Sequence, residues 1–92
     1  MRKEPFLVPD QCRAARGLIG WSRGRLSERC GVAASTLADF EVGKREPYGR
    51  TLADVRRTLE EAGVVFIPAD KAGGPGVRLQ RPTLSSGLND RV

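Results

Sequence analysis

Histidine is absent from this 92-residue chain, and its two cysteines, Cys12 and Cys30, are well separated. Zinc sites in small domains need Cys and His ligands at close, regular spacing, so the sequence predicts no metal centre. Two distant cysteines in a cytoplasmic protein are typical of free, buried thiols rather than of a disulfide. We therefore expect both cysteines to serve as small apolar side chains.

Without histidine, the chain also lacks the residue that most often acts as a general acid or base. The segment GGPG at residues 73–76 follows a strand-like run, but it lacks the Lys-Ser/Thr and the helix of a phosphate loop. No other group of residues in the sequence supplies the nucleophile, general base and stabilising groups of a catalytic site. The sequence therefore predicts no enzyme and no cofactor.

No apolar run approaches the roughly 18–20 residues that span a bilayer. The first ten residues, MRKEPFLVPD, contain no apolar stretch long enough for a signal peptide. These absences predict a cytoplasmic protein with no membrane contact. A chain of this length forms one small domain, which a partner subunit would help to stabilise.

Positive charge is in excess and unevenly distributed. Residues 1–50 hold ten Lys and Arg against six Asp and Glu, and residues 51–92 hold six against five, which together give the net charge of +5. A cationic first half is typical of a surface that binds phosphates, although solubility alone also favours net charge.

Residues 23–42 read RGRLSERCGVAASTLADFEV, which is two short amphipathic segments joined at one glycine. Apolar residues spaced three or four apart give each segment one inward face. Gly31 can adopt the left-handed conformation that ends the first segment. This unit predicts a helix-turn-helix that presents a second helix, residues 33–42, to a DNA groove. The positions that have the required spacing are Leu26, Ser27, Gly31, Val32, Leu37 and Phe40.

Two further helices flank this unit. The first covers residues 10–19, with an apolar stripe at helical spacing. Ser22 is a good N-cap for the helix that ends at Cys30, whereas the helix from Ala33 or Ala34 has no side-chain cap. Thr51 and Asp54 resemble a capping box, which predicts the start of a last helix that stops at Gly63.

Val64-Val65-Phe66-Ile67 is β-branched and aromatic and predicts a strand, and residues 77–79 could form a returning strand. A hairpin of two strands is marginal in water, so it must pack on the helices or pair by its edge with a second subunit. We favour edge pairing, which makes these four residues the expected dimerisation site. The predicted organisation is an arm at 1–9, a DNA-binding domain at 10–63, the hairpin at 64–81 and a flexible polar tail at 82–92.

Three groups of residues follow a recurrent pattern: Gly31-Val32, Thr36-Leu37 and the string Phe40-Glu41-x-Gly43-x-Arg45-x-Pro47. In this pattern the chain resembles the lambda-repressor-like helix-turn-helix proteins, also called the Cro/CI-type or XRE family. The resemblance implies a mainly α fold, a four-helix bundle to which this chain adds a C-terminal β-strand or hairpin. It also implies a bacterial or phage-derived, nucleoid-associated protein that binds double-stranded operator DNA, usually as a homodimer.

The expected recognition helix is poor in long polar side chains. Members of the family often carry Gln, Arg, Asn or Lys on its exposed face. The corresponding residues here can make none of the bidentate base contacts that those side chains make. They are Ala33, Ala34, Ser35, Ala38 and Asp39. Asp39 could accept a hydrogen bond from cytosine, but we favour an ion pair with Arg45. Specificity then rests partly on DNA shape and dimer spacing. The expected base contacts are Ala34, Ser35, Thr36, Ala38 and Asp39.

Phosphate contacts have stronger candidates, although each is also an ordinary solvated side chain. Two lie at the start of the first motif helix, where backbone amides favour anions. The others lie in or after the loop that follows the recognition helix, where the family grips the DNA backbone. We interpret Glu41 as structural, because DNA would repel an exposed carboxylate. The expected phosphate contacts are Ser22, Arg23, Lys44, Arg45, Tyr48 and Arg50.

The sequence thus predicts a dimeric, sequence-specific transcriptional regulator, most often a repressor in this family. The alternative is an antitoxin-type interaction module that binds a toxin and also represses its own operon. Residues 82–92 have little apolar content with which to mask a toxin, which weighs against the alternative.

Overall fold

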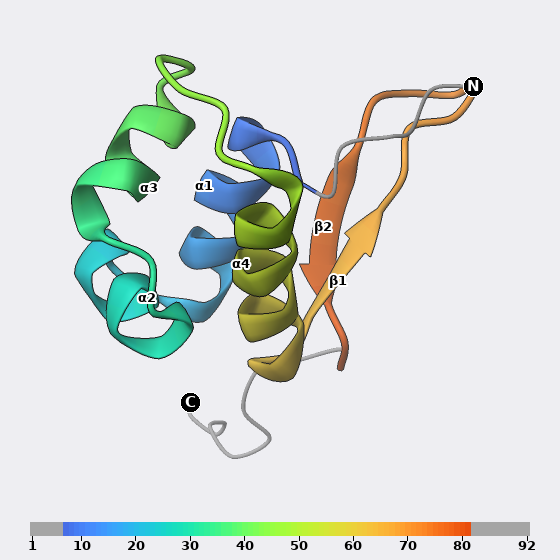
Figure 1. Cartoon of the computed structure of the whole chain (residues 1–92). Helices are drawn as coiled ribbons and strands as arrows, with labels where there is room; N and C mark the ends of the chain where they lie inside the picture. The colour runs from blue at the N-terminus through green and yellow to red at the C-terminus, as the bar shows by residue number, and fades with distance from the viewer. Residues whose placement is uncertain (1–6, 82–92) are drawn as a thin grey trace.

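The computed structural model describes residues 7–81 and contains four helices followed by a β-hairpin (Figure 1). The predicted mainly α fold with a C-terminal hairpin is therefore confirmed. The two ends of the chain, 1–6 and 82–92, lie outside the described residues, and so do the expected tail and most of the expected arm. The elements are α1 (Pro9–Ile19), α2 (Arg23–Cys30), α3 (Ala34–Glu41), α4 (Gly49–Glu61), β1 (Val64–Ile67) and β2 (Gly76–Leu79).

Local signals set the ends of the two motif helices. The Ser22 hydroxyl accepts the Arg25 N–H at 3.0 Å and caps α2, as predicted. Gly31 closes α2 in the left-handed region, with φ +79°, where a residue with a Cβ would be strained. As expected, α3 begins after Ala33 without a side-chain cap. The helix-turn-helix geometry therefore follows from a few local residues.

The predicted start of α4 is wrong by three residues, because the expected N-cap is Thr51 and the observed one is Tyr48. The helix begins at Gly49, and its first backbone hydrogen bond joins the Leu52 N–H to the Tyr48 carbonyl at 3.0 Å. No side chain caps this end, so the expected capping box at Thr51 is not used. Asp54 instead forms an ion pair with Arg57, one turn further along the helix, at 2.8 Å. The chain turns into the helix immediately after Pro47 and does not wait for a capping side chain.

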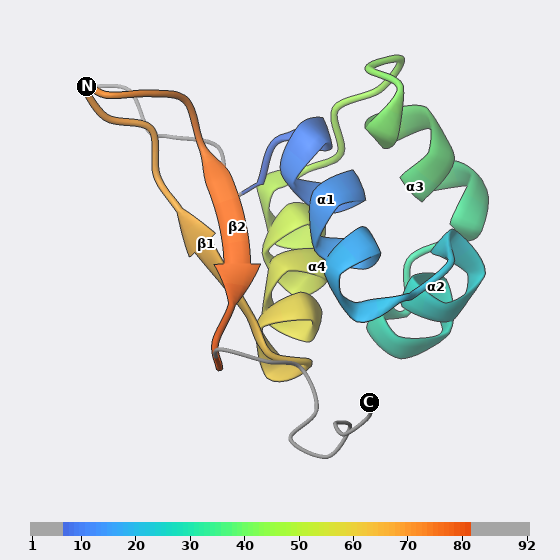
Figure 2. The ribbon, with the colours of Figure 1, turned by 180° about the vertical axis from the view of Figure 1, so that it is seen from behind.

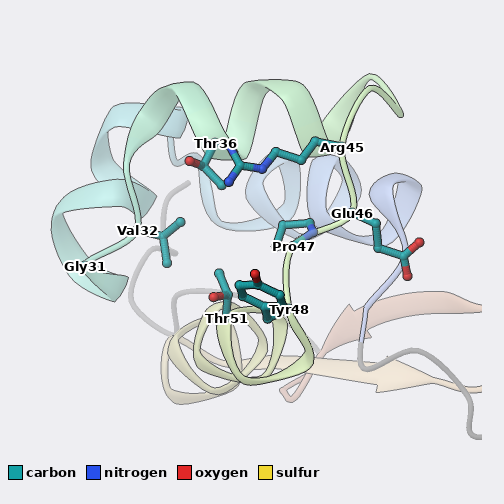
Figure 3. Close-up of a pocket in the computed structure, with 8 residues that line it drawn as sticks. All are labelled: Gly31, Val32, Thr36, Arg45, Glu46, Pro47, Tyr48 and Thr51. Carbon is teal, nitrogen blue, oxygen red and sulfur yellow. The ribbon is translucent and has the colours of Figure 1, made fainter.

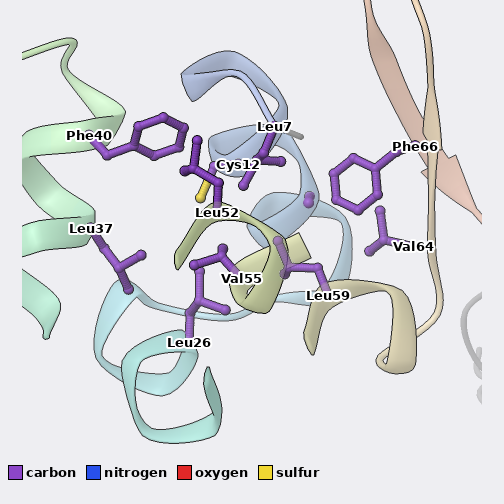
Figure 4. Packing of buried hydrophobic residues seen from close by; sticks show 11 residues of the cluster. Leu7, Cys12, Leu26, Leu37, Phe40, Leu52, Val55, Leu59, Val64 and Phe66 are labelled. Atoms are coloured by element: carbon purple, nitrogen blue, oxygen red, sulfur yellow. The ribbon is translucent and has the colours of Figure 1, made fainter. Parts of the chain in front are cut away.

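The elements form three layers, with α1 and α4 between the α2–α3 pair and the hairpin (Figures 1 and 2). The four helices and β1 contribute buried apolar side chains to one continuous core (Figure 4), and Val77 of β2 packs against it while partly buried. This arrangement leaves α3 and the hairpin on opposite sides of the molecule. The buried residues are Leu7, Cys12, Ala15, Leu26, Leu37, Phe40, Leu52, Val55, Leu59, Val64 and Phe66.

The hairpin packs on the helices, which was one of the two arrangements that the sequence left open. Its strands are antiparallel and pair Val64 with Leu79 and Ile67 with Gly76. The buried Gln11 amide of α1 donates to the Gly76 carbonyl at 3.0 Å and to the Ile67 carbonyl at 3.4 Å. Its oxygen accepts the Val8 N–H at 3.1 Å. The amide thus fixes the hairpin to α1, while edge pairing with a second subunit stays a prediction.

The four residues expected to dimerise split between the two faces of β1. Side chains alternate along a strand, and Val64 and Phe66 lie in the core of the subunit. Val65 is half-buried and Ile67 is 37% exposed on the outer face. Only these two side chains are therefore left open for contact with another molecule.

Candidate DNA-binding interface

The residues of α3 separate into a buried and an open face. Leu37 and Phe40 enter the core, together with the carboxylate of Glu41. The side chains on the other face are small, so the helix surface stands clear of large protrusions. On that face Ala34 and Ser35 are exposed, and Thr36, Ala38 and Asp39 are half-buried.

A groove of about 420 Å³ lies beside α3 (Figure 3). Its walls come from the helix-turn-helix turn, from α3, from the loop after it and from the first turn of α4. It brings together three expected contacts, Thr36, Arg45 and Tyr48, and Tyr48 is 86% exposed. The full lining is Gly31, Val32, Thr36, Arg45, Glu46, Pro47, Tyr48 and Thr51.

A second group of expected phosphate contacts lies at the start of α2. Ser22 is exposed, and its oxygen accepts the Arg25 N–H, so the hydroxyl hydrogen is still free to be donated. Arg23 has a side chain that is 44% exposed, and its guanidinium lies 3.9 Å from Glu41. The group is therefore next to the C-terminal end of α3.

Glu41 anchors that end of α3 from within the core, as the structural interpretation predicted. Its carboxylate is 1% exposed and accepts two hydrogen bonds from Arg16, at 2.7 and 2.8 Å. The Cys12 thiol donates a third at 3.0 Å. Arg13 donates to the Glu41 backbone carbonyl. Three α1 side chains thus hold the last residue of the recognition helix.

These contacts also set the ionisation of the cluster. Burial by itself would raise the pKa of Glu41, but hydrogen bonds from Arg16 and Cys12, with the charges of Arg16 and Arg23, hold it below its usual range. Burial and the hydrogen bond to Glu41 raise the pKa of the Cys12 thiol. The pair is therefore an ionised carboxylate and a neutral thiol, and Cys12 is a free cysteine, as expected.

The predicted ion pair between Asp39 and Arg45 is wrong. Among residues 7–81 no ion pair joins the two side chains, and Arg45 lies in the groove instead. The chain reverses at Gly43, with φ +82°, and the Lys44 N–H donates to the Asp39 carbonyl at 2.8 Å. This turn, rather than a side-chain pair, fixes the loop. Lys44 and Arg50 are exposed, and no ion pair holds either of them within the described part of the chain.

Sequence reasoning missed two residues of this surface. Val42 directly follows α3 and is 65% exposed, which is unusual for a large apolar side chain and gives this face an apolar contact point. It stands at the end of the expected recognition helix, and the sequence indicated no role for it. Thr51 lines the groove because α4 begins early.

A family model described as helix-turn-helix matches residues 13–61, which is more than half of the chain. The chain belongs to the XRE-type helix-turn-helix family. A search of curated proteins gave no match. The matched residues run from α1 to the end of α4, so the hairpin lies outside the family model.

Membership of the XRE family makes DNA the partner of this chain, and the family is not enzymatic. None of the helices within residues 7–81 has the length and apolarity needed to cross a membrane. In the same stretch, no group of three or more His, Cys, Asp or Glu side chains is placed to hold a metal ion. Because DNA is the family's partner, the candidate DNA-binding surface is the side of α3 that carries the groove with Arg45 and Tyr48.

Proposed function

We propose that this XRE-family protein is a sequence-specific transcriptional repressor that binds its operator as a homodimer, with α3 in the major groove. One observation carries the proposal. The open face of α3 is flanked by Ser22 and Arg23 at one end and by the groove with Arg45 and Tyr48 along its side. A helix between two such groups can enter the major groove of DNA while the side chains at both flanks reach phosphates.

Base readout in this proposal is short-range. Ser35 and Thr36 exchange single hydrogen bonds with base edges, and Asp39 accepts from a cytosine amino group. Ala34 and Ala38 touch thymine methyl groups, and their small size lets the α3 backbone approach the bases closely. Because these contacts are individually weak, DNA shape and the spacing of two half-sites supply the rest of the specificity.

Phosphate contacts supply most of the affinity. Ser22 donates its hydroxyl hydrogen, and the first amides of α2 add their partial positive charge. Arg45 and Tyr48 contact phosphates of the DNA strand that runs along the protein groove beside α3. Lys44 and Arg50 extend the same basic rim, and both are exposed. Arg23 contacts a phosphate while its other side stays close to the buried Glu41.

Replacement of Arg45 by alanine tests the groove directly. Arg45→Ala is expected to weaken binding to specific and random DNA alike and to reduce the slope of log affinity against log salt by about one. The matched control is Lys71→Ala, which removes one exposed positive charge from the hairpin, on the side away from α3. A salt titration of fluorescence anisotropy measures both slopes. An equal change in the two variants would remove Arg45 from the contact surface.

The proposed function as a whole is tested by selection of bound duplexes from a random pool. We expect an enriched site made of two symmetric half-sites about 10 base pairs apart. Reporter transcription from a promoter that carries the site should fall when the protein is expressed. Binding without sequence preference would contradict the regulator, and activation of the reporter would contradict the repressor.

A further inference from the structure

The hairpin has two open edges, and its hydrogen-bond pattern shows which groups they expose. The Gln80 N–H donates to the Gly63 carbonyl at 2.8 Å, which makes this a hydrogen-bonded pair. In an antiparallel ladder, hydrogen-bonded pairs alternate with pairs whose backbone N–H and C=O groups point away from the partner strand. In this hairpin the outward-pointing pairs are Val64 with Leu79 and Phe66 with Val77. Among residues 7–81, no group beyond the hairpin accepts a hydrogen bond from these four N–H groups.

The surroundings of the two edges differ in charge. On the β1 side, the Arg56 guanidinium lies 4.9 Å from the centre of the Phe66 ring and pairs with Glu60 at 2.9 Å. Charged side chains beside an edge disfavour the approach of another strand. β1 is therefore the protected edge of the hairpin.

On the face that meets the helices, the β2 edge is bordered by uncharged residues. On α1, Ala14 and Leu18 follow Gln11 at helical spacing, and Gln11 is the residue that contacts β2. Leu18, Val77 and Leu79 are all half-buried, so an apolar margin runs along this edge. An open backbone edge with an apolar border is a template for strand pairing.

We propose that β2 pairs with β2 of a second copy of this chain, antiparallel and centred on Val77, to form a four-stranded sheet. The inference rests on the proposed function to the extent that a dimeric repressor needs a symmetric interface. It differs from the sequence prediction, which placed the interface at β1. In this register the two Val77 residues exchange both hydrogen bonds, and each Leu79 N–H donates to the Pro75 carbonyl of the other copy.

Charge favours this register over its neighbour. A pairing centred on Arg78 would place two guanidinium groups directly opposite each other, whereas the Val77 register places Arg78 opposite Gly76 of the other copy. It also brings Arg81 opposite Gly73 of the second copy, next to the Asp70 carboxylate. Asp70 accepts hydrogen bonds from the Ala72 and Gly73 N–H groups but has no ion pair among the described residues.

The symmetry of such a pair suits DNA binding. The two-fold axis of an antiparallel strand pair is perpendicular to the sheet, so both copies keep their helices on the same side of it. Because α3 lies on the far side of the helical layer from the hairpin (Figures 1 and 2), both recognition helices then face the same way. The small Ala14 side chains also let the two α1 helices approach each other beneath the central strands.

The test uses a charge change at Gly76. A Cβ added there meets nothing within 4 Å, and its φ is not in the left-handed region, so the subunit accepts a side chain. Gly76→Glu places a carboxylate opposite Arg78 of the other copy, and Gly76→Lys places a second cation there. Sedimentation of the full chain at low salt should show dimers about tenfold tighter for Gly76→Glu than for Gly76→Lys, with a smaller difference at high salt. The double variant Gly76→Lys, Arg78→Glu should restore the dimer.

Val65→Glu is the matched control on β1, because Val65 lies opposite Arg78 in the hairpin and a lysine there would repel it. It leaves the β2 dimer intact, whereas a pairing of two β1 strands centred on Val65 would bring the two new glutamates together. Circular dichroism melts of the monomeric subunit check that each variant folds. A wild-type chain that stays monomeric at about 100 µM would overturn the inference, as would dissociation by Val65→Glu with no difference between the Gly76 variants.

Cross-linking fixes the register. In a Cys30→Ala background, a mixture of Gly76→Cys and Arg78→Cys chains should form mixed disulfide dimers, because the two positions face each other in a non-hydrogen-bonded pair. Dimers formed by Arg78→Cys alone would instead indicate the register centred on Arg78 and contradict ours. If the chain fails these tests but still selects specific DNA sites, the β2 interface is refuted and the proposed function is not. If the β2 dimer forms but binds no specific DNA, the proposed function is refuted and the β2 interface is not.

Discussion

Glu41→Ala is expected to destabilise the fold by about 3 kcal/mol, the largest effect of any single change that we predict. The carboxylate is 1% exposed and accepts hydrogen bonds from Arg16 and Cys12. Without it, Arg16 would keep a partly buried charge with no counter-ion, and the Cys12 thiol would lose its acceptor. Urea unfolding followed by circular dichroism measures the change in the free energy of unfolding.

The matched control is Asp54→Ala, which removes a carboxylate from an exposed pair with Arg57 on α4. Exposed ion pairs contribute under about 1 kcal/mol, so this variant should stay close to the wild type. Equal losses in the two variants would mean that the buried cluster has no special role in stability.

The same cluster predicts an acid-dependent loss of stability. The pKa of Glu41 is lower in the folded protein than its ordinary value of 4.5. Its contribution is therefore fully present above the unfolded pKa and is lost as the pH falls through the folded one. The urea midpoint of the wild type should fall as the pH drops below the ordinary pKa of 4.5, and Glu41→Gln should show a smaller fall. Parallel curves for the two proteins would assign the acid dependence to other carboxylates.

The position of Glu41 links stability to DNA recognition. It is the last residue of α3, and its partners lie on α1, the central helix on which the hairpin also packs. Gln11, five residues before Arg16 on α1, holds the hairpin from the other side of the same helix. In a dimer built through the hairpin, α1 would therefore set the position of each recognition helix. Glu41 anchors α3 to one side of α1, and Gln11 anchors the hairpin to the other side.

Local chemistry explains which features the sequence could predict. Gly31 needs a left-handed backbone, Ser22 caps the helix that follows it, and residues 64–67 form a strand. Each of these depends on neighbours along the chain or on residue type alone. The four-helix fold and the outward face of α3 follow from the same local patterns.

The features that were missed depend on residues far apart in the sequence. Periodicity placed Cys12 in the core but could not identify Glu41 as its partner, because a hydropathy pattern reports burial and not contacts. The sequence likewise gave no indication that the Gln11 amide would donate to backbone carbonyls of the hairpin, more than fifty residues away. The Asp39–Arg45 pair failed for the opposite reason, since closeness in sequence implied a contact, whereas the chain reverses at Gly43 and Arg45 lines the groove instead.

Ser35→Glu is expected to abolish specific DNA binding, with a loss of about 100-fold or more, while the subunit remains folded. Ser35 is exposed in the first turn of α3, at the centre of the proposed interface. A carboxylate there would face the phosphates of both strands, and juxtaposed like charges cost several kcal/mol in an interface. Negative charge in the first turn of a helix instead stabilises that helix slightly, so the melting temperature should be unchanged or higher.

These opposite effects separate loss of contact from loss of structure. The matched control is Ala69→Glu, which adds the same charge at an exposed position in the hairpin loop, on the side of the molecule away from α3. It changes the net charge equally and should reduce DNA affinity only through weak long-range repulsion, which salt screens. Anisotropy titrations and thermal melts of both variants provide the comparison. If the two variants lost affinity equally, the change in net charge would be the cause, and α3 would not be the surface that meets DNA.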